Sequence, residues 1–589
     1  MPPFTKILVA NRGEITVRVC RTLRELEIAS VAVYSEADRG SLHAVFADES
    51  YLVGPGTPAE SYLHQERILD AALRSGAEAV HPGYGFLAEN ADFARAVEAA
   101  GLVWIGPPPE AMELMGSKVA ARQTMSAAGV PIIPGTTETV ETADDVCRLG
   151  DEIGWPIAIK ASAGGGGKGL KVVASADEVE RAFEAARREG QAYFSDSAVY
   201  VERYLDNPRH VEVQILADAH GSVIHLGERD CTIQRRHQKL VEETPSPAVD
   251  EELRSEIGRI AVDAARAVGY RSAGTIEGLL SSEGEYFFLE MNTRLQVEHT
   301  VTELVTGLDL VREQVLIAAG EPLSLSQEDV RLEGHAIECR INAEDPSTGF
   351  LPAPGRITGY REPAGPGVRV DSGVREGSEV VGLYDPLVAK LCVHDIDREH
   401  ARRRMLRALG EYEIEGITTL VGFHRALLDH ACFVAGETCH GVVESPELAD
   451  EAAQLSHMTT SVPAASDGRL QGRSVQAEVE GRRFAITLLE PEPPHAELAR
   501  RRRDRDAQQG HHGAARDAIV TPMQGTVLAV EVAEGDAVEP GQVVCVVEAM
   551  KMENEITSPR AGTVSELSVE PGQPVTTGQV ICLVTQDEG

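Results

Sequence analysis

The densest group of side chains capable of chemistry lies in residues 286–299, YFFLEMNTRLQVEH. Its aromatic start predicts a strand, in which alternate residues share a face. Glu290 and Asn292 then point the same way, as does Arg294 if the strand continues. Oxygen ligands of this kind suit Mg²⁺, and Glu277 offers a second carboxylate on a nearby strand. We therefore expect a metal site of Glu277, Glu290 and Asn292 rather than a solvated strand face, because buried carboxylates are rare unless paired or metal-bound.

A second candidate is the glycine-rich run 163–169, AGGGGKG, between predicted strands at Ile157–Lys160 and Leu170–Val173. It fits G-x-G-x-x-G formally, but a strand follows instead of the helix of a dinucleotide-binding turn. The Walker A pattern fails too, and the HRD and DFG motifs of kinases do not follow. A glycine-rich hairpin remains, whose bare amides can wrap phosphate oxygens. The alternative is a flexible linker, which is rarely bracketed so tightly by β-branched strands.

The third candidate is Lys551, which stands between Met550 and Met552. The surrounding sequence repeats with an offset of 37 residues, so that Gly525-Thr526-Val527 recurs as Gly562-Thr563-Val564. This repeat predicts a small pseudo-symmetric β-sandwich with Lys551 on an exposed hairpin between its halves. An ordinary surface lysine is the alternative, but methionines on both sides of it would be an unusual use of exposed apolar surface.

The N-terminal part predicts a parallel α/β unit that positions further loops. The predicted strands are Ile7–Ala10, Ser30–Tyr34, Ala79–His81 and Val103–Ile105, with a helix ending near Leu26. Ligands of such sheets bind beyond the carboxyl ends of the strands. Asn11–Gly13 and His81–Phe86 both fall there, although the second is equally typical of a tight glycine turn.

Composition excludes several classes of protein. The chain has 589 residues and a formal charge of −38, which predicts several domains and argues against nucleic acid as a partner. Nine cysteines without a CxxC pair favour reduced thiols over a disulfide framework or a zinc site. The N-terminus lacks a signal peptide pattern, and no apolar run approaches the ~20 residues that span a bilayer. We expect a cytoplasmic protein with no membrane partner.

Two stretches resemble known families. Ala549-Met550-Lys551-Met552, with Thr521-Pro522-Met523, resembles the biotin carboxyl carrier domain over about residues 519–586. This resemblance implies covalent biotin on Lys551, attached by biotin protein ligase. The related lipoyl domain is the alternative, but its lysine does not usually lie between two methionines.

Residues 4–445 resemble biotin carboxylase, the ATP-grasp half of biotin-dependent carboxylases. The matching motifs include Pro208–Gln214, Glu228–Cys231, Gln234–Lys239 and Phe288–His299. The resemblance implies an α/β N-terminal domain (4–113), an α+β ATP-grasp domain (114–335, lid about 132–203) and a C-terminal domain (336–446). The all-β biotinyl sandwich (519–586) would end the chain.

The biotin carboxylase resemblance also implies roles for residues. The ATP site would comprise Lys118, Lys160, Gly166, Gly167, Glu202, Arg203, Leu205, His210, Gln234 and His237. Lys239, Arg294 and Val297 would place bicarbonate, and Glu298 would be the base that activates it. Arg340 would face carboxyphosphate and biotin, and the metal would be Mg²⁺ or Mn²⁺.

The match has departures. Arg203 stands where a lysine is common, and the two differ in geometry. Gly278 replaces a more familiar aromatic residue and is expected to open space near the nucleotide. Thr300 replaces an expected proline.

Residues 447–518 fall outside both resemblances. Residues 456–468 predict a linker, Arg473–Leu489 predicts a hairpin, and 491–513 is typical of a charged tether whose Arg500–Arg503 run is solvated. A segment of this length is well below the ~100–150 residues of a typical domain. A carboxyltransferase therefore cannot fit in it.

These observations together predict the α-subunit of an acetyl- or propionyl-CoA type carboxylase. It would use ATP and bicarbonate, and a separate carboxyltransferase β-subunit would bind acyl-CoA in a hetero-oligomer. The alternatives are a 3-methylcrotonyl-CoA type α-subunit, a different ATP-grasp ligase, or a non-catalytic carrier. Lys551 argues against the second, and the set Glu277, Glu290, Asn292 and Arg294 argues against the third.

Overall fold

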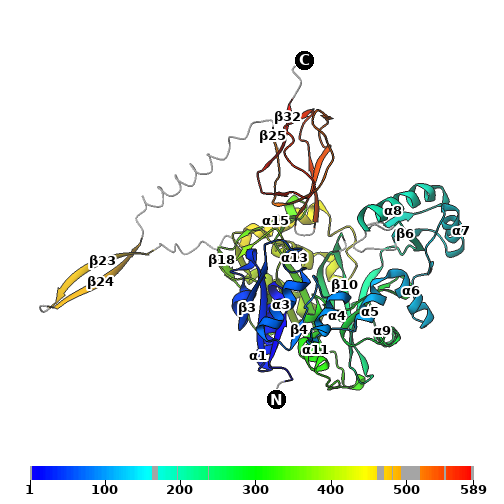
Figure 1. Ribbon diagram of the computed structural model, residues 1–589, viewed down its shortest axis with the longest axis horizontal. Coiled ribbons are helices and arrows are strands. Elements are labelled where there is room, and N and C mark those ends of the chain that lie inside the picture. Colours follow the sequence, from blue (N-terminus) through cyan, green and yellow to red (C-terminus); the bar gives the residue numbers. More distant parts are fainter. Residues whose placement is uncertain are drawn as a thin grey trace. The chain divides into compact units, whose positions relative to one another are not determined.

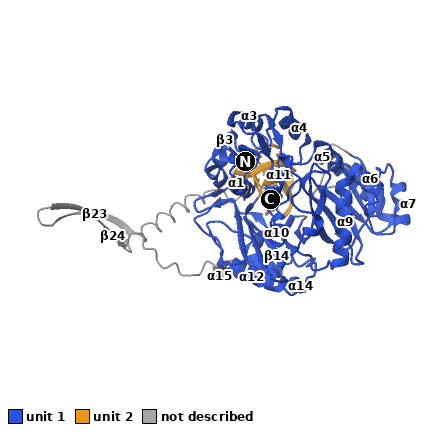
Figure 2. Cartoon of the chain, turned by 90° about the horizontal axis from the view of Figure 1, so that it is seen from below, with its two compact units in different colours: residues 1–381, 386–456 blue, residues 382–385, 457–589 orange. Residues whose placement is uncertain are grey.

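The computed structural model describes residues 3–161, 170–194, 197–236, 238–459, 470–479, 482–491, 518–549 and 552–585. The chain divides into two compact units (Figure 2). The first comprises residues 1–381 and 386–456, and the second comprises 382–385 and 457–589. Within the described residues, no helix combines the length and the apolar character needed to cross a bilayer.

The chain begins with a five-stranded parallel sheet in the order β3-β2-β1-β4-β5 (Figure 1). The strands are β1 (Lys6–Val9), β2 (Ala29–Ser35), β3 (Glu49–Gly54), β4 (Ala79–His81) and β5 (Val103–Trp104). The connecting helices are α1 (Gly13–Glu25), α2 (Leu42–Phe46), α3 (Gln65–Ser75) and α4 (Ala91–Ala99). The predicted parallel unit is confirmed, and β3 adds an edge strand that the sequence did not reveal because it lacks a continuous apolar run.

A three-stranded antiparallel sheet, β7-β6-β8, forms a separate layer with two helices. Its elements are α7 (Ala143–Ile153), β6 (Ile157–Ala161), β7 (Leu170–Val173), α8 (Val179–Phe194) and β8 (Val199–Arg203). Val146, Ile157, Val173 and Phe183 form its core. The predicted pairing of the strands around the glycine-rich run is confirmed, and residues 162–169 lie outside the described residues.

The largest element is an eight-stranded antiparallel sheet in the order β13-β12-β9-β10-β11-β14-β21-β19. The strands are β9 (Arg209–Ala217), β10 (Val223–Arg235), β11 (Gln238–Thr244), β12 (Ser272–Leu280), β13 (Tyr286–Asn292), β14 (His335–Asn342), β19 (Val368–Ser372) and β21 (Leu387–Asp395). We call it the central sheet. It crosses the expected boundary at residue 336, because β14 begins at His335 and pairs with β11. The polypeptide after that boundary therefore extends the same sheet.

Helices and short strands complete the first unit. The remaining helices are α5 (Pro109–Gly116), α6 (Lys118–Ala127), α9 (Glu251–Ala267), α10 (His299–Thr306), α11 (Leu310–Ala318), α12 (Arg398–Glu411), α13 (Val421–Asp429), α14 (Ala431–Val434) and α15 (Pro446–Thr459). The short strands are β15 (Glu344–Asp345), β16 (Leu351–Pro352), β17 (Gly355–Arg356), β18 (Gly359–Arg361), β20 (Glu379–Val380) and β22 (Glu413–Glu415).

Two expectations about this region are wrong. The linker predicted from residue 456 begins later, because α15 continues to Thr459 and is anchored through buried Leu448 and Ala452. The cysteines are not all free thiols, since Cys432 and Cys439 form a disulfide with Cα atoms 5.4 Å apart. The turn after α14 brings these two cysteines together, although their seven-residue separation matches no CxxC spacing.

The second unit contains two all-β parts. Strands β23 (Leu470–Val479) and β24 (Arg482–Pro491) pair antiparallel, which confirms the predicted hairpin. Residues 518–549 and 552–585 form two four-stranded sheets, β25-β32-β30-β27 and β29-β28-β26-β31. Their strands are β25 (Ala518–Val520), β26 (Gly525–Val530), β27 (Ala537–Val538), β28 (Val543–Ala549), β29 (Met552–Thr557), β30 (Gly562–Ser565), β31 (Pro574–Val575) and β32 (Val580–Thr585).

The 37-residue repeat explains this arrangement. It relates β25, β26, β27 and β28 to β29, β30, β31 and β32, so each sheet has the strand order of the other. The two sheets share one core, which includes Val527 and its repeat equivalent Val564. Gly525 and Gly562 also match, since a Cβ would lie 2.3 Å from the Glu548 carbonyl oxygen and 2.6 Å from that of Thr585, respectively. The predicted pseudo-symmetric sandwich is confirmed.

Candidate active site

Neighbouring strands of the central sheet carry seven of the predicted site residues. His210 lies on β9, Gln234 on β10, Lys239 on β11, Glu277 on β12, Glu290 and Asn292 on β13, and Arg340 on β14. The segment between β13 and α10 adds Arg294, Val297 and Glu298. Residues far apart in the sequence are thus brought to one region by strand pairing.

The Lys239 ammonium group lies at the centre of this region. Its Nζ donates to Glu212 Oε2 at 2.6 Å, Glu277 Oε1 at 3.0 Å and Glu298 Oε1 at 2.6 Å. Burial alone would lower the pKa of Lys239, but the three carboxylates reverse this effect and raise the pKa well above its ordinary value. Lys239 is therefore a fixed cation.

Glu298 is held between two cations. Its second oxygen, Oε2, accepts a hydrogen bond from Arg340 Nη2 at 2.9 Å, and its residue is only 2% exposed. Burial would raise the pKa of Glu298, but Lys239 and Arg340 hold it well below the ordinary value. Arg340 Nε in turn donates to buried Glu242 at 2.6 Å. This arrangement keeps an ionised carboxylate beside two groups that can bind an anion.

Arg294 reaches the same region from beyond the end of β13. Its Nη2 donates to Asn292 Oδ1 at 3.0 Å, and its Nε donates to Glu89 Oε2 at 3.0 Å. Glu89 follows the His81–Phe86 segment of the parallel sheet. This segment is a tight glycine turn, and because Glu89 contacts Arg294 it also lies near the site. Val297 contributes a carbonyl oxygen, which accepts a hydrogen bond from Lys390 Nζ at 2.8 Å.

The residues expected to hold a metal fit a divalent cation. Glu277 lies directly opposite Glu290 in the β12–β13 register, and Asn292 Nδ2 donates to Glu277 Oε1 at 2.6 Å. Burial and the neighbouring Glu277 both raise the pKa of Glu290. In the described part of the chain, the Glu290 carboxylate has no hydrogen-bond partner. A partly buried carboxylate without a hydrogen-bond partner that faces a second carboxylate is a favourable environment for Mg²⁺.

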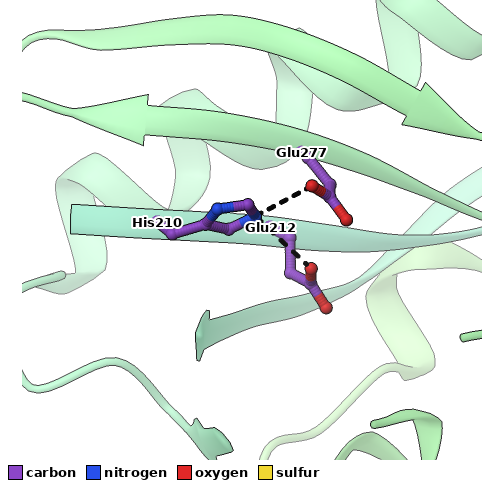
Figure 3. Close-up of side chains that lie close together, drawn as sticks. All are labelled: His210, Glu212 and Glu277. Atoms are coloured by element: carbon purple, nitrogen blue, oxygen red, sulfur yellow. Dashed lines mark ion pairs between the residues drawn. The ribbon is translucent and has the colours of Figure 1, made fainter. Parts of the chain in front are cut away.

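A different group, His210, Glu212 and Glu277, also brings ligand atoms close together (Figure 3). His210 Nε2 lies 2.9 Å from Glu277 Oε2 and 3.9 Å from Glu212 Oε2. Lys239 Nζ, however, already bridges Glu212 and Glu277. Because the ammonium charge occupies the place of a cation there, this group is an ion-pair network.

The residues predicted to bind ATP are only partly grouped. Glu202 is buried and pairs with Lys160 and with Arg122, whose Nη1 lies 3.0 Å from Glu202 Oε2. Burial lowers the pKa of Lys118, and the negative charge of Glu290 acts against this effect. The charge of Lys118 thus interacts with Glu290, Lys160 and Glu202.

Other predicted residues point elsewhere or are not described. Arg203 pairs with Glu285 at 3.2 Å, and Leu205 packs against Ile133 and Phe287. Gln234 Nε2 donates to the Cys231 carbonyl oxygen at 2.8 Å. Strands β28 and β29 pair on either side of Lys551, with Ala549 opposite Met552. The predicted residues outside the described ranges are Gly166, Gly167, His237 and Lys551.

One expectation about the departures is wrong. Gly278 does not open space, because a Cβ at this position would lie 2.2 Å from the Tyr286 ring. The Tyr286 hydroxyl donates to the Val211 carbonyl oxygen at 3.3 Å, so this aromatic ring fills the position. Thr300 donates a hydrogen bond to the buried carboxylate of Glu338 and accepts one from Cys392 at 3.2 Å.

Three residues of this network, Glu212, Glu89 and Arg229, were not predicted from the sequence. Glu212 could have been found, since it alternates with His210 and Gln214 on the same strand face. Arg229 lies in the matching motif Glu228–Cys231, but nothing in that pattern gives it a role. Glu89 carried no signal, because its partner Arg294 lies 205 positions away in the sequence.

Family comparisons cover most of the chain, with residues 446–516 as the longest unmatched stretch. The matching families are "Biotin carboxylase, N-terminal domain" over residues 3–112, "Carbamoyl-phosphate synthase L chain, ATP binding domain" over 117–326, "Biotin carboxylase C-terminal domain" over 338–445 and "Biotin-requiring enzyme" over 517–584.

Individual relatives agree with this division. The biotin-dependent acyl-coenzyme A carboxylase alpha3 subunit of Mycobacterium leprae is 46% identical over 94% of both chains. Biotin carboxylase 1 of Bacillus subtilis is 52% identical over 73% of this chain and 96% of its own length. The biotin carboxylase domain of Hydrogenobacter thermophilus 2-oxoglutarate carboxylase, solved with MgADP, ADP and bicarbonate, is 47% identical with a TM-score of 0.71, covering 75% of this chain and 99% of its own. The chain therefore belongs to the family of biotin-dependent carboxylases, as a biotin carboxylase fused to a biotin carrier domain.

Proposed function

We propose that this chain is the α-subunit of an acyl-CoA carboxylase of the acetyl- or propionyl-CoA type. It would use ATP and bicarbonate to carboxylate biotin on its own Lys551, and a separate β-subunit would transfer the carboxyl group to acyl-CoA. The observation that supports the biotin carboxylation step is the placement of Glu298 between Lys239 and Arg340.

The chemistry of bicarbonate explains this placement. Bicarbonate is a poor nucleophile, so removal of its proton by Glu298 assists attack on the γ-phosphorus of ATP. An oxygen–phosphorus bond then forms to give carboxyphosphate as the bond to ADP breaks. Lys239, Arg294 and the Val297 backbone would place the anion, and the cations would stabilise the charge that develops. An anion that shares Lys239 and Arg340 weakens their hold on Glu298, which raises the proton affinity of this base when substrate binds.

Mg²⁺ fits Glu277, Glu290 and Asn292, and when bound it would neutralise phosphate charge during the transfer. Biotin, attached to Lys551 by a biotin protein ligase, would supply the ureido nitrogen that accepts the carboxyl group. Arg340 would donate hydrogen bonds to anionic groups on that side of the site. The residues that would surround the nucleotide are Lys118, Lys160, Gly166, Gly167, Glu202, Arg203, Leu205, His210, Gln234 and His237.

The proposed partner follows from what segment 447–518 can hold. Its described residues contribute α15 and the β23–β24 hairpin, and the segment as a whole is shorter than a typical domain, which is too little for an acyl-CoA-binding carboxyltransferase. We place β-subunit docking on the β23–β24 hairpin, since its ten-residue strands pair only with each other among the described strands.

The identity of the acyl-CoA acceptor is a separate part of the proposal. The Mycobacterium leprae acyl-CoA carboxylase chain matches across the carrier domain as well, which favours the acyl-CoA type. A second candidate is a 3-methylcrotonyl-CoA type α-subunit. The corresponding relative, the mitochondrial methylcrotonoyl-CoA carboxylase alpha chain of Dictyostelium discoideum, is 50% identical over 75% of this chain and 63% of its own length.

The test of the acceptor is reconstitution of the chain with its β-subunit. Carboxylation rates with acetyl-, propionyl- and 3-methylcrotonyl-CoA are then compared. We expect preference for acetyl- or propionyl-CoA, and preference for 3-methylcrotonyl-CoA would replace the first proposal with the second.

The biotin carboxylase half is tested with the purified chain alone. ATP hydrolysis should depend on both bicarbonate and biotin, and it should be lost in Glu298→Gln. Glu251→Gln is the matched control, since Glu251 is exposed at the start of α9. Full bicarbonate-dependent activity in Glu298→Gln would exclude Glu298 as the base.

A further inference from the structure

Arg229 lies behind the proposed reacting groups and is not itself one of them. It is on β10, opposite Glu212 on β9, and its residue is 0% exposed. A buried guanidinium is expensive unless its donors are all satisfied. The acceptor of each N–H group therefore shows which residues the buried guanidinium holds in place.

All five N–H donors of Arg229 are used. Nε donates to Glu212 Oε1 at 2.6 Å. Nη1 donates to Gln214 Oε1 at 2.7 Å and Thr302 Oγ1 at 2.9 Å. Nη2 donates to Gln296 Oε1 at 2.8 Å and Thr275 Oγ1 at 3.1 Å. The planar guanidinium offers five donors in fixed directions, whereas a lysine ammonium has only three donors, so a lysine at this position could not hold all five acceptors.

These acceptors surround Glu298 in two ways. Gln296 precedes Glu298 by two residues and Thr302 follows it on α10, so Arg229 fixes the chain on both sides of the base. Glu212 accepts from Arg229 with one oxygen and from Lys239 with the other, and Lys239 contacts Glu298.

The same fork reaches the metal residues. Gln296 accepts from Arg229 through Oε1 and donates through Nε2 to Glu277 Oε1 at 2.5 Å. Rotation of the Gln296 amide would break both bonds, so Arg229 also fixes a contact of Glu277. Arg229 thus reaches Lys239 through Glu212 and Glu277 through Gln296, and Lys239 in turn contacts the proposed base.

We propose that Arg229 is a positioning residue that sets the distance between Lys239 and Glu298 for bicarbonate activation. This inference rests on the proposed roles of Lys239 and Glu298. Without the Arg229 fork, Glu212 would have Lys239 as its main partner and would draw Lys239 away from Glu298. The base would then lose a stabilising charge, and its proton affinity would rise.

The test is the kinetics of the purified, full-length Arg229→Lys variant. A misplacement of about 1 Å costs roughly 100-fold in rate, so we expect a fall of that order in kcat for bicarbonate-dependent ATP hydrolysis. The KM for bicarbonate should rise while the KM for ATP stays near the wild-type value. The acid limb of the pH–rate profile should move to higher pH, because a base with a higher proton affinity needs a higher pH to be ionised.

Arg254→Lys is the matched control. Arg254 contacts the preceding residue of β10, Glu228, at 2.9 Å and 3.0 Å, and among the described residues it makes no contact with Lys239, Glu298 or Gln296. Its lysine variant should lose thermal stability while keeping the wild-type pH profile. If Arg229→Lys behaves like this control, or changes the KM for ATP as much as kcat, the positioning role is wrong.

Two further outcomes are a variant that does not fold and a wild-type chain that lacks the activity, and each has its own consequence. If Arg229→Lys does not fold, the double variant Thr275→Val, Thr302→Val removes two acceptors but keeps the charge. It should show a smaller change of the same kind, and a wild-type rate and profile would overturn the proposal. If the wild-type chain itself lacks bicarbonate-dependent hydrolysis, the proposed function fails, independently of Arg229.

Discussion

Single residues in this protein act through shared charges more than through isolated contacts. Lys239 contacts three carboxylates, and Glu298 contacts two cations. In such a network the removal of one member leaves another buried charge unpaired, which costs more than the bond itself. Substitutions in it should therefore affect the rate in groups and not additively.

The metal assignment predicts the effect of Glu290→Gln. Loss of a ligand charge should weaken phosphate neutralisation and reduce bicarbonate-dependent ATP hydrolysis by on the order of 100-fold. Free biotin should not restore activity, because the lesion precedes biotin. Steady-state hydrolysis over a range of Mg²⁺ concentrations measures this. Glu283→Gln, in the exposed turn between β12 and β13, is the control, and equal loss in both variants would refute the assignment.

Glu14 gives a prediction about stability and pH. Burial raises its pKa to about 8, and neither carboxylate oxygen has a hydrogen-bond partner among the described residues. Because the folded-state pKa lies above the unfolded value of about 4.3, the stabilising contribution of the neutral acid is lost as pH rises toward 8. Glu14→Gln should therefore raise the melting temperature by a few degrees at alkaline pH and little at acid pH.

Thermal melts at several pH values test this prediction. The opposite result, a variant destabilised most at alkaline pH, would mean that Glu14 is ionised and stabilised by Lys390, which lies 3.5 Å away.

At the scale of elements, sequence patterns predicted local structure better than pairing. The alternation of Glu290 and Asn292 and the strands around the glycine-rich run were readable because they depend on neighbours in the sequence. The Glu277–Glu290 register and the Arg294–Glu89 pair depend on strands and loops that meet only in the fold. The 37-residue repeat was an exception, because it predicted from the sequence alone that two distant halves form equivalent strands.

The β23–β24 hairpin carries a prediction at this scale. Replacing residues 470–491 with a flexible linker should abolish capture of the β-subunit. Bicarbonate-dependent ATP hydrolysis by the chain should stay near the wild-type rate. Co-purification and ATPase assays on the same preparation measure both. Intact β-subunit binding after this replacement would move docking elsewhere.

At the scale of the whole molecule, the chain divides the work between a carboxylase unit and a carrier. Purified alone, it should hydrolyse ATP with bicarbonate and biotin but should not carboxylate acetyl-CoA or propionyl-CoA. Radiolabelled bicarbonate incorporation into acyl-CoA measures this. Incorporation by a preparation free of other subunits would place a second active site on this chain.

The central claim is that the chain carboxylates biotin on its own Lys551. The most direct measurement incubates the biotinylated chain with MgATP and radiolabelled bicarbonate, then isolates the protein rapidly in the cold. We predict ATP-dependent label on the wild-type chain, with none on Lys551→Arg and none on biotinylated Glu298→Gln. Label on Lys551→Arg, or none on the biotinylated wild-type chain, would contradict this claim.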